Sequence, residues 1–353
     1  MIVKKILSLA ASIIKLFIII LLFNSNTKAE EKNIKYYSDD RGILALMYHR
    51  FDENKYPSTN IQMTVFKKQI KIIKNLKYNF YDPKDLEKSF YTPKIEKKIL
   101  ITIDDAFSSF YEIAWPYLKK EKIPFILFVS TKTAGKNGYM TWSQIKELDK
   151  ENTVYIGNHS HSHSYLVDLK NEEFVNDIDT STSIFKEKLG YNPIFFSYPF
   201  GEYSALIKKY ISKNFKFSFG QHSGLIDINK DRYELPRFPI NEKYGDIKRF
   251  EFLINLNPFQ YKVLRPNEKF LTDNNNPPKF MVEFFDEQKN LNNINCFSNE
   301  GGSWKKSNIN FNLNTLSLNF REKFNFRRGR INCSLNDNGI WRWFGVQFSV
   351  DLG

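Results

Sequence analysis

The alternation of short apolar runs with amphipathic stretches between Gly42 and Asn241 is the feature that most constrains the fold of this 353-residue chain. The candidate strands are Ile43 to Tyr48, Ile99 to Ile103, Phe125 to Ser130, Thr153 to Gly157, Phe195 to Tyr198 and Phe215 to Phe219. The candidate helices are Val65 to Leu76, Phe110 to Leu118, Trp142 to Leu148, Glu172 to Leu189 and Tyr203 to Ser212. Repeated β-then-α units predict parallel strands with helices outside them. The pattern fits an open doubly wound sheet and a closed barrel equally well.

The pattern changes from about Phe259 onward. Three asparagines and two prolines at 274–278 break the chain, and period-two runs follow: Phe280 to Phe285, Ile309 to Phe320, Gly329 to Ser334 and Trp341 to Val350. Such runs, separated by Asn, Gly and Asp, are typical of antiparallel strands. We therefore expect an α/β domain over 30–258 and a small antiparallel β domain over 259–353.

The N-terminus is typical of an export signal. Lys4 and Lys5 precede an apolar run from Ile6 to Phe23, and Thr27-Lys28-Ala29 resembles a cleavage site. We therefore expect a signal peptide over 1–29 and an exported protein, periplasmic or extracellular. The alternative is an uncleaved signal that tethers the chain to a membrane, because about 18 apolar residues is near the lower limit for crossing the hydrocarbon layer.

The formal net charge of +13 agrees with association with a membrane or another part of the cell envelope. Lys, Asn and Ile are all abundant, however, so a general composition bias accounts for the charge equally well. We find no nucleic-acid motif and expect no nucleic-acid partner.

The two cysteines, Cys296 and Cys333, lie in the C-terminal third and form no C-x-x-C pattern. In an exported protein such a pair favours a disulfide over a metal site or a nucleophile. Closing that loop would stabilise the fold by roughly 3 to 4 kcal/mol.

Three of the five histidines fall within the run Gly-Asn-His-Ser-His-Ser-His, at His159, His161 and His163. Alternate residues of a strand face one way, so these imidazoles can begin on one side. Asp104 and Asp105 end another predicted strand. Imidazole and carboxylate suit a catalytic divalent ion with an open position for water. A solvated acidic loop and a surface histidine turn are the alternatives, but the two features together favour a metal site.

These segments resemble the polysaccharide deacetylase family, carbohydrate esterase family 4. Its first motif, T-F-D-D-G, is similar to Thr102 to Ala106, and its second, H-[ST]-x-x-H, is similar to His159 to His163. Ala106 departs from the family's glycine. The resemblance covers about Ile43 to Asn241 and implies a distorted (β/α) barrel as the catalytic domain.

The resemblance also implies a role for each matched residue. Asp104 is expected to be the catalytic base, and Asp105, His159 and His163 are expected to bind a divalent metal. Zn²⁺ is the first expectation, with Co²⁺, Ni²⁺ or Mn²⁺ as alternatives. His161 occupies the variable position of the motif and is expected to be a non-ligand.

A third segment, Phe196 to Gly201, is similar to the family's third motif. Ser197 stands where that motif has an arginine that steadies the base. The resemblance places the Phe200 backbone N–H at the oxyanion and Tyr198 near the substrate. Arg237 lies in another family-like segment; it either replaces the missing arginine or is a surface residue.

The general acid is expected in an unusual place. The family's last motif, L-x-x-H, is not found after Pro199, whereas Leu44 to Arg50 puts His49 at the end of the first strand. This order resembles the circularly permuted poly-N-acetylglucosamine deacetylases, and it predicts His49 as the general acid, with a structural histidine as the alternative. His222 is either a substrate contact or a loop histidine.

The function implied by the resemblance is a hydrolase of linear amides that removes N-acetyl groups from an acetylated polysaccharide containing N-acetylglucosamine. The alternatives are a non-catalytic glycan-binding protein with the same fold, and an amidase that acts outside the polysaccharides. For the C-terminal domain the resemblance says nothing. Its aromatic residues either stack on sugars or form the core: Trp304, Trp341, Trp343 and Phe344.

Overall fold

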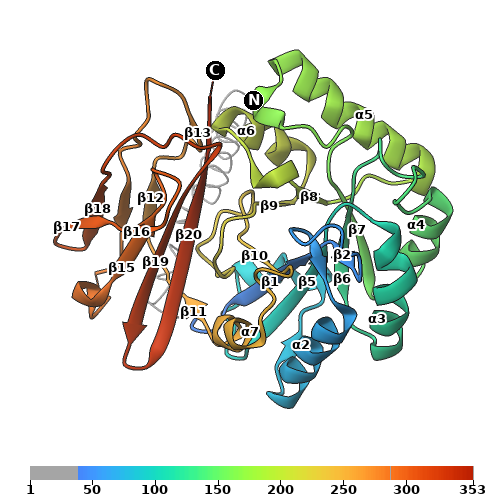
Figure 1. Ribbon diagram of the computed structural model, residues 1–353, viewed down its shortest axis with the longest axis horizontal. Helices are drawn as coiled ribbons and strands as arrows, with labels where there is room; N and C mark the ends of the chain where they lie inside the picture. Colours follow the sequence, from blue (N-terminus) through green and yellow to red (C-terminus); the bar gives the residue numbers. More distant parts are fainter. Residues whose placement is uncertain (1–38, 287, 353) are drawn as a thin grey trace, which may run out of the picture. The chain divides into compact units, whose positions relative to one another are not determined.

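A parallel sheet of eight strands forms the first part of the computed structural model, which describes residues 39–286 and 288–352 (Figure 1). The strand order is β10-β1-β5-β6-β7-β8-β9, with β4 beside β5. The strands are β1 (Ile43–Tyr48), β4 (Asn79–Phe80), β5 (Lys98–Ile103), β6 (Phe125–Val129), β7 (Val154–Asn158), β8 (Phe195–Ser197), β9 (Phe217–Phe219) and β10 (Phe238–Pro239). The predicted signal peptide over 1–29 lies outside the described residues.

The central strands are apolar on both faces, as parallel strands between two layers require. On β5, Ile99, Ile101 and Ile103 pack into the core beneath the helices, whereas Leu100 packs into the core on the opposite face. The same alternation continues past the end of the strand, so that Asp104 lies on the Leu100 side. The strand pattern thus points the first candidate catalytic residue into the barrel interior.

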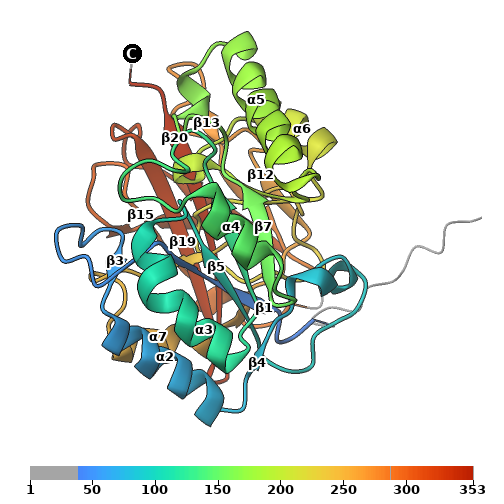
Figure 2. The same cartoon turned by 90° about the vertical axis from the view of Figure 1, so that its right-hand side faces the viewer.

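The helices that follow the strands are amphipathic and bury one face each. They are α2 (Met63–Asn75), α4 (Trp142–Asp149), α5 (Asn171–Leu189), α6 (Ala205–Asn214) and α7 (Ile247–Ile254). Figure 2 shows α2, α3, α4 and α5 on one side of the parallel strands. The predicted helix from Phe110 to Leu118 is divided into a π-helical turn, η3 (Phe110–Ala114), and α3 (Trp115–Glu121). Pro116, which has no N–H to donate, stands at the start of α3.

The barrel is incomplete between its end strands. No ladder joins β9 to β10 within the described residues, and a bridge from Phe219 to Leu235 lies there instead. The fold is therefore a distorted (β/α) barrel, which decides between the two arrangements that the sequence pattern left open. A further short pair, β2 (Arg50–Phe51) and β3 (Asn60–Ile61), follows β1.

The C-terminal region is built from two predominantly antiparallel sheets. One has the order β11-β20-β19-β15-β16 with β13 beside β20, and the other has the order β12-β14-β18-β17. Their strands are β11 (Asn257–Pro258), β12 (Val263–Arg265), β13 (Phe270–Leu271), β14 (Met281–Glu283), β15 (Asn295–Ser298), β16 (Lys305–Lys306), β17 (Asn308–Asn312), β18 (Thr315–Asn319), β19 (Arg328–Asp337) and β20 (Ile340–Val350). The run from Ile309 to Phe320 is therefore a hairpin rather than one strand, because Leu313 turns the chain with a φ of 54°.

A disulfide joins Cys296 on β15 to Cys333 on β19, as the sequence predicted. The strand β11 pairs with β20, so the first residues of the C-terminal sheet precede the expected boundary at 258/259. That boundary stays a prediction.

The C-terminal sheet contacts the barrel through polar side chains. Ser223 donates a hydrogen bond to Asn332 at 2.8 Å, and Glu202, which is buried, pairs with Arg327 at 2.7 Å and Arg328 at 2.9 Å. Figure 1 shows β19 and β20 facing the barrel. Of the helices in the described residues, none has both the length and the apolar character needed to cross a bilayer.

Candidate metal centre and active site

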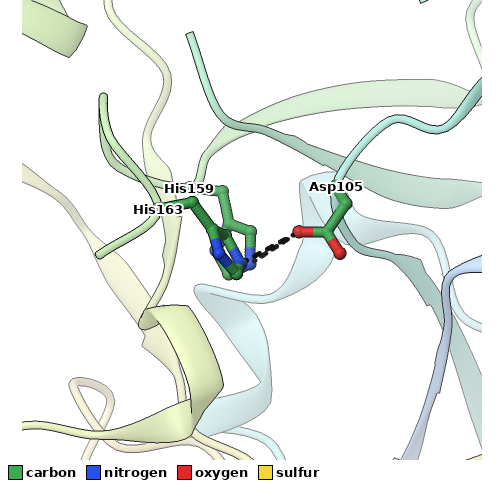
Figure 3. A group of neighbouring side chains, drawn as sticks. All are labelled: Asp105, His159 and His163. Carbon is green, nitrogen blue, oxygen red and sulfur yellow. Dashed lines mark ion pairs between the residues drawn. The ribbon is translucent and has the colours of Figure 1, made fainter. Parts of the chain in front are cut away.

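Three candidate metal ligands come together at the carboxyl edge of the parallel sheet (Figure 3). Asp105 follows β5, and His159 and His163 follow β7, two strands away. The Oδ1 atom of Asp105 lies 3.0 Å from Nε2 of His163 and 3.5 Å from Nε2 of His159. One ligand atom from each of the three residues lies within 4.8 Å of the others. This donor set of two imidazoles and one carboxylate fits a divalent ion such as Zn²⁺.

The His159 side chain is held with Nε2 directed at the ligand cluster. Its Nδ1 lies 2.7 Å from the backbone carbonyl of Ser197, which can only accept, so Nδ1 carries the proton and Nε2 has a free lone pair. Burial lowers the pKa of His159 to about 4, which keeps the ring neutral at physiological pH. A neutral imidazole with an open Nε2 is the form that binds metals.

The turn after β7 is fixed by its own polar contacts. The side chain of Asn158 accepts the Ser160 N–H at 2.8 Å, and Asp177 on α5 accepts the N–H groups of His161 and Ser162 at 2.7 and 3.0 Å. His163 has a φ of 57°, a left-handed conformation uncommon outside glycine. The turn therefore brings His163 back toward Asp105. The His161 ring instead contacts the Thr131 hydroxyl at 2.8 Å and is outside the ligand cluster.

Asp104 forms a fully buried ion pair with Arg237. The guanidinium NH1 donates to Oδ1 at 2.6 Å and NH2 donates to Oδ2 at 2.8 Å, while both residues have no exposed surface. Arg237 also donates to the hydroxyls of Ser197 and Thr102, at 2.8 and 3.1 Å. Burial alone would raise the pKa of Asp104, but Arg237, His159 and His49 together hold that pKa below its ordinary value. Asp104 is thus kept ionised and fixed in orientation.

Arg237 therefore lies where a family arginine would steady the base, and Ser197 contacts the same guanidinium. Of the two readings that the sequence left open, the surface arginine is wrong, because the side chain is completely buried. An arginine reaching Asp104 from the segment before β10 replaces one that the family supplies from the position of Ser197.

His49 stands at the end of β1, which lies between β10 and β5 in the sheet. Together with Asp105 and His163 it lines a cavity of about 710 Å³. His49 also contributes to lowering the pKa of both neighbouring aspartates, after the larger effects of Arg237 and His163. The early-strand histidine is therefore beside the ligand cluster.

The remaining candidate residues have different surroundings. Phe200 lines the cavity and has a φ of 59°, and its ring stacks on Tyr165 at 4.0 Å between centroids. His222 also lines the cavity. The Tyr198 side chain is instead buried against Tyr203, and its hydroxyl donates to the Tyr233 carbonyl. Any part of Tyr198 near the substrate is therefore its backbone.

The C-terminal sheet supplies one wall of the same cavity, a placement that was not predicted from the sequence. The wall consists of aromatic and polar side chains: Trp304, Arg328, Arg330, Asn332, Trp343 and Val346. Phe344, in contrast, belongs to the core of the C-terminal region. The alternation on β19 was a usable signal, because Arg328, Arg330 and Asn332 fall on one face of a period-two strand.

Residues 92–217 match the family model described as polysaccharide deacetylase. A poly-β-1,6-N-acetyl-D-glucosamine N-deacetylase of Staphylococcus aureus is 24% identical over 256 residues, which cover 62% of this chain and 86% of that protein. The deacetylase PplD of Streptococcus pyogenes, solved with acetate, has a TM-score of 0.55 at 21% identity and covers 61% of this chain and 99% of its own. IcaB from Ammonifex degensii has a TM-score of 0.54 at 24% identity, covering 61% and 97%. The structural matches support the fold.

The barrel, its edge of paired acids and histidines, and the matching family model define a hydrolase that acts on carbon–nitrogen bonds. Residues 92–217 form a polysaccharide deacetylase domain, as the sequence motifs predicted.

Proposed function

We propose that this protein is an exported, metal-dependent N-deacetylase of a polysaccharide that contains N-acetylglucosamine. The observation that carries the proposal is the cluster of Asp105, His159 and His163 beside the buried Asp104–Arg237 pair. The similarity to the Staphylococcus aureus poly-β-1,6-N-acetyl-D-glucosamine N-deacetylase supports N-acetylglucosamine as the substrate unit. Export is proposed from the apolar N-terminal sequence alone.

Asp105, His159 and His163 would hold the divalent ion, with Zn²⁺ as the first candidate. When bound, such an ion would lower the pKa of a coordinated water to about 7 and would polarise a carbonyl oxygen. Each His ligand needs its Nε2 unprotonated, and the Ser197 carbonyl secures this for His159.

Asp104 is the proposed base, which would accept a proton from the attacking water. Its two oxygens are fixed by Arg237, and Oδ2 lies 4.0 Å from Nε2 of His159, so the carboxylate stands next to the ligand cluster without belonging to it. An oriented base of this kind contributes on the order of 10²- to 10⁴-fold to the rate.

The other two roles concern the tetrahedral intermediate and the leaving group. The Phe200 N–H would donate a hydrogen bond to the developing oxyanion, for which one donor is worth about 3 kcal/mol. His49, in its protonated form, would deliver a proton to the departing sugar amine, which is otherwise a poor leaving group. The products are acetate and a glucosamine unit.

Two departures from the family motifs favoured the alternative of a non-catalytic glycan-binding protein: the replaced arginine of the third motif and Ala106 in place of glycine. Arg237 removes much of that argument, because the base has a bidentate arginine partner after all. A binding protein would have no need for a base so held beside a metal site.

Acetate release from N-acetylglucosamine oligomers tests the proposal. The full chain is stripped of metal with a chelator, resupplied with Zn²⁺ or Co²⁺, and compared with Asp104→Asn. We expect release that returns with the metal and falls at least about 10²-fold in the variant. Tight metal binding without release from any acetylated glycan would refute the deacetylase and favour the binding protein.

A further inference from the structure

The cavity beside the candidate metal centre is lined by cations. Its charged side chains on the C-terminal side are Arg328 and Arg330, and α7 adds Arg249. Among its described lining residues Asp105 is the one carboxylate, and that residue is a proposed metal ligand. The cavity therefore has positive charge that its own acids do not balance.

The three arginines are not equivalent. Arg328 donates to the buried carboxylate of Glu202 at 2.9 Å. Arg249 donates to the Tyr244 carbonyl and lies 5.0 Å from the centroid of the Tyr244 ring. Arg330 donates to the side-chain oxygen of Gln347 at 3.1 Å. No described carboxylate forms an ion pair with Arg249 or Arg330.

Arg249 and Arg330 converge on one part of the cavity. Tyr244 lines the cavity with them and interacts electrostatically with both guanidinium groups. Both side chains are half-buried, and burial lowers the pKa of each; the positive charge of Arg328 lowers that of Arg330 further. Neither guanidinium has a described carboxylate within ion-pair distance, and Arg330 receives only a small attraction from the charge of Glu202. An anion placed between the two arginines would therefore offset the cost of their partial desolvation.

Groups suited to a sugar chain lie around these arginines. Asn332 follows Arg330 on the same face of β19, and Trp304 and Trp343 line the same cavity. Trp304 is 46% exposed, which leaves its ring open to contact. Amphipathic rings can pack against a sugar while an adjacent guanidinium binds an oxyanion with two parallel hydrogen bonds.

We propose that Arg249 and Arg330 form an anion subsite and that the natural substrate is an acidic polysaccharide. The subsite would bind a carboxylate or phosphate carried by a sugar unit near the acetylated one. This inference rests on the proposed deacetylase function, because the subsite shares a cavity with the metal centre. A consequence is that the ammonium group of a deacetylated unit is disfavoured there, which promotes release of the product.

Binding without turnover is the direct test. The full-length Asp104→Asn chain with Zn²⁺ is titrated calorimetrically with three oligosaccharides of equal length. One is a neutral N-acetylglucosamine oligomer, the second alternates N-acetylglucosamine with glucuronate, and the third is an N-acetylglucosamine oligomer with phosphodiester groups. We expect at least one acidic oligomer to bind about ten-fold more tightly than the neutral one, since a charge-assisted hydrogen bond is worth that much. Which acidic oligomer binds more tightly distinguishes carboxylate from phosphate.

Two variants locate the subsite. Arg249→Gln and Arg330→Gln should each remove most of that preference and leave the affinity for the neutral oligomer within about two-fold. The matched control is Arg265→Gln, which removes an exposed arginine on β12 outside the cavity and should change nothing. Thermal unfolding of each variant verifies that it folds. In the chain that keeps both arginines, the preference for acidic over neutral oligomers should also decrease as the salt concentration rises.

The possible results distinguish a failure of the proposed anion subsite from a failure of the proposed deacetylase function. Equal or tighter binding of the neutral oligomer, or Gln variants that behave like Arg265→Gln, would overturn the anion subsite. Acetate release from the neutral oligomer by the wild-type chain would then leave the deacetylase standing. An acidic preference in binding without acetate release from any of the three would instead refute the deacetylase.

Discussion

The two walls of the cavity position their side chains in different ways. At the carboxyl edge of the parallel sheet, five non-glycine residues have left-handed backbone: Asp105 (φ 71°), Ala106 (φ 54°), Ser160 (φ 66°), His163 (φ 57°) and Phe200 (φ 59°). On the opposite wall, Arg328, Arg330 and Asn332 occupy successive outward positions of the regular strand β19. Left-handed residues other than glycine store about 1 to 3 kcal/mol each and tend to cluster at active sites. The first wall therefore carries the candidate catalytic residues, whereas the second presents the regular face of a strand.

The treatment of charge differs in the same way. The buried charge of the parallel sheet is neutralised internally, since Arg237 takes both oxygens of Asp104. On the other wall Arg330 faces the cavity with an amide as its hydrogen-bond partner. A charge paired inside the fold serves the enzyme's own geometry, whereas a charge left facing a cavity is available to a ligand.

The largest expected contrast is in stability. Arg237→Gln leaves the buried Asp104 carboxylate without its partner, which should lower the free energy of unfolding by about 3 to 5 kcal/mol. Arg330→Gln removes a cation that has no described acidic partner and should change it by about 1 kcal/mol or less. Urea unfolding of the two variants measures both. Similar decreases in the free energy of unfolding for the two variants would contradict the distinction between a charge paired inside the fold and a charge that faces a ligand.

Removing the disulfide is expected to have the second-largest effect on stability. Cys296 and Cys333 are separated by 37 positions, and removing the disulfide that closes a loop of that length should cost roughly 4 kcal/mol of stability. The Cys296→Ser/Cys333→Ser double variant, compared with the parent in urea, measures that loss. A single shifted transition would mean that both walls unfold together, whereas a separate early transition of the C-terminal sheet would make them independent.

The smallest expected effect concerns His222, which lines the cavity beside the C-terminal strand β20. Burial lowers its pKa from 6.5 to about 4, so the unfolded chain binds the proton first as the pH falls. Stability should therefore be lost between about pH 6.5 and 4, and His222→Gln should remove that part of the loss. Unfolding of the metal-free chain at pH 7 and 5 measures it. His161→Gln is the control, and an unchanged pH slope in His222→Gln would contradict the assignment.

Much of the parallel wall could be predicted from sequence, because its ligands are close together in the chain and have motif spacing. Two short segments of sequence were enough to identify Asp105, His159 and His163 as candidate ligands. For the partner of Asp104 the sequence offered Arg237 but left a surface position equally open, since the two residues are 133 positions apart. Only the folded chain decides between these two alternatives.

The wall formed by the C-terminal sheet was harder to predict from the sequence, for a different reason. The period-two pattern of β19 indicated a strand with one polar face, but nothing in the pattern said what that face would meet. The helix α7, which carries Arg249, had a usable signal: Asp246 caps it by accepting the Arg249 N–H, and Phe250, Leu253 and Ile254 form its buried stripe. The helix was missed, so the cluster with Tyr244 and Arg330 was missed too.

Asp105, His159 and His163 are proposed to hold a metal that deacetylation requires. Acetate release from N-acetylglucosamine oligomers at one buffered Zn²⁺ concentration tests this proposal most directly when His163→Ala is compared with His161→Ala, since both lie in one turn and only His163 belongs to the ligand cluster. We expect His163→Ala to lose both bound Zn²⁺ and acetate release, and His161→Ala to retain both. Retained release in His163→Ala, or equal losses in the two variants, would contradict the proposal.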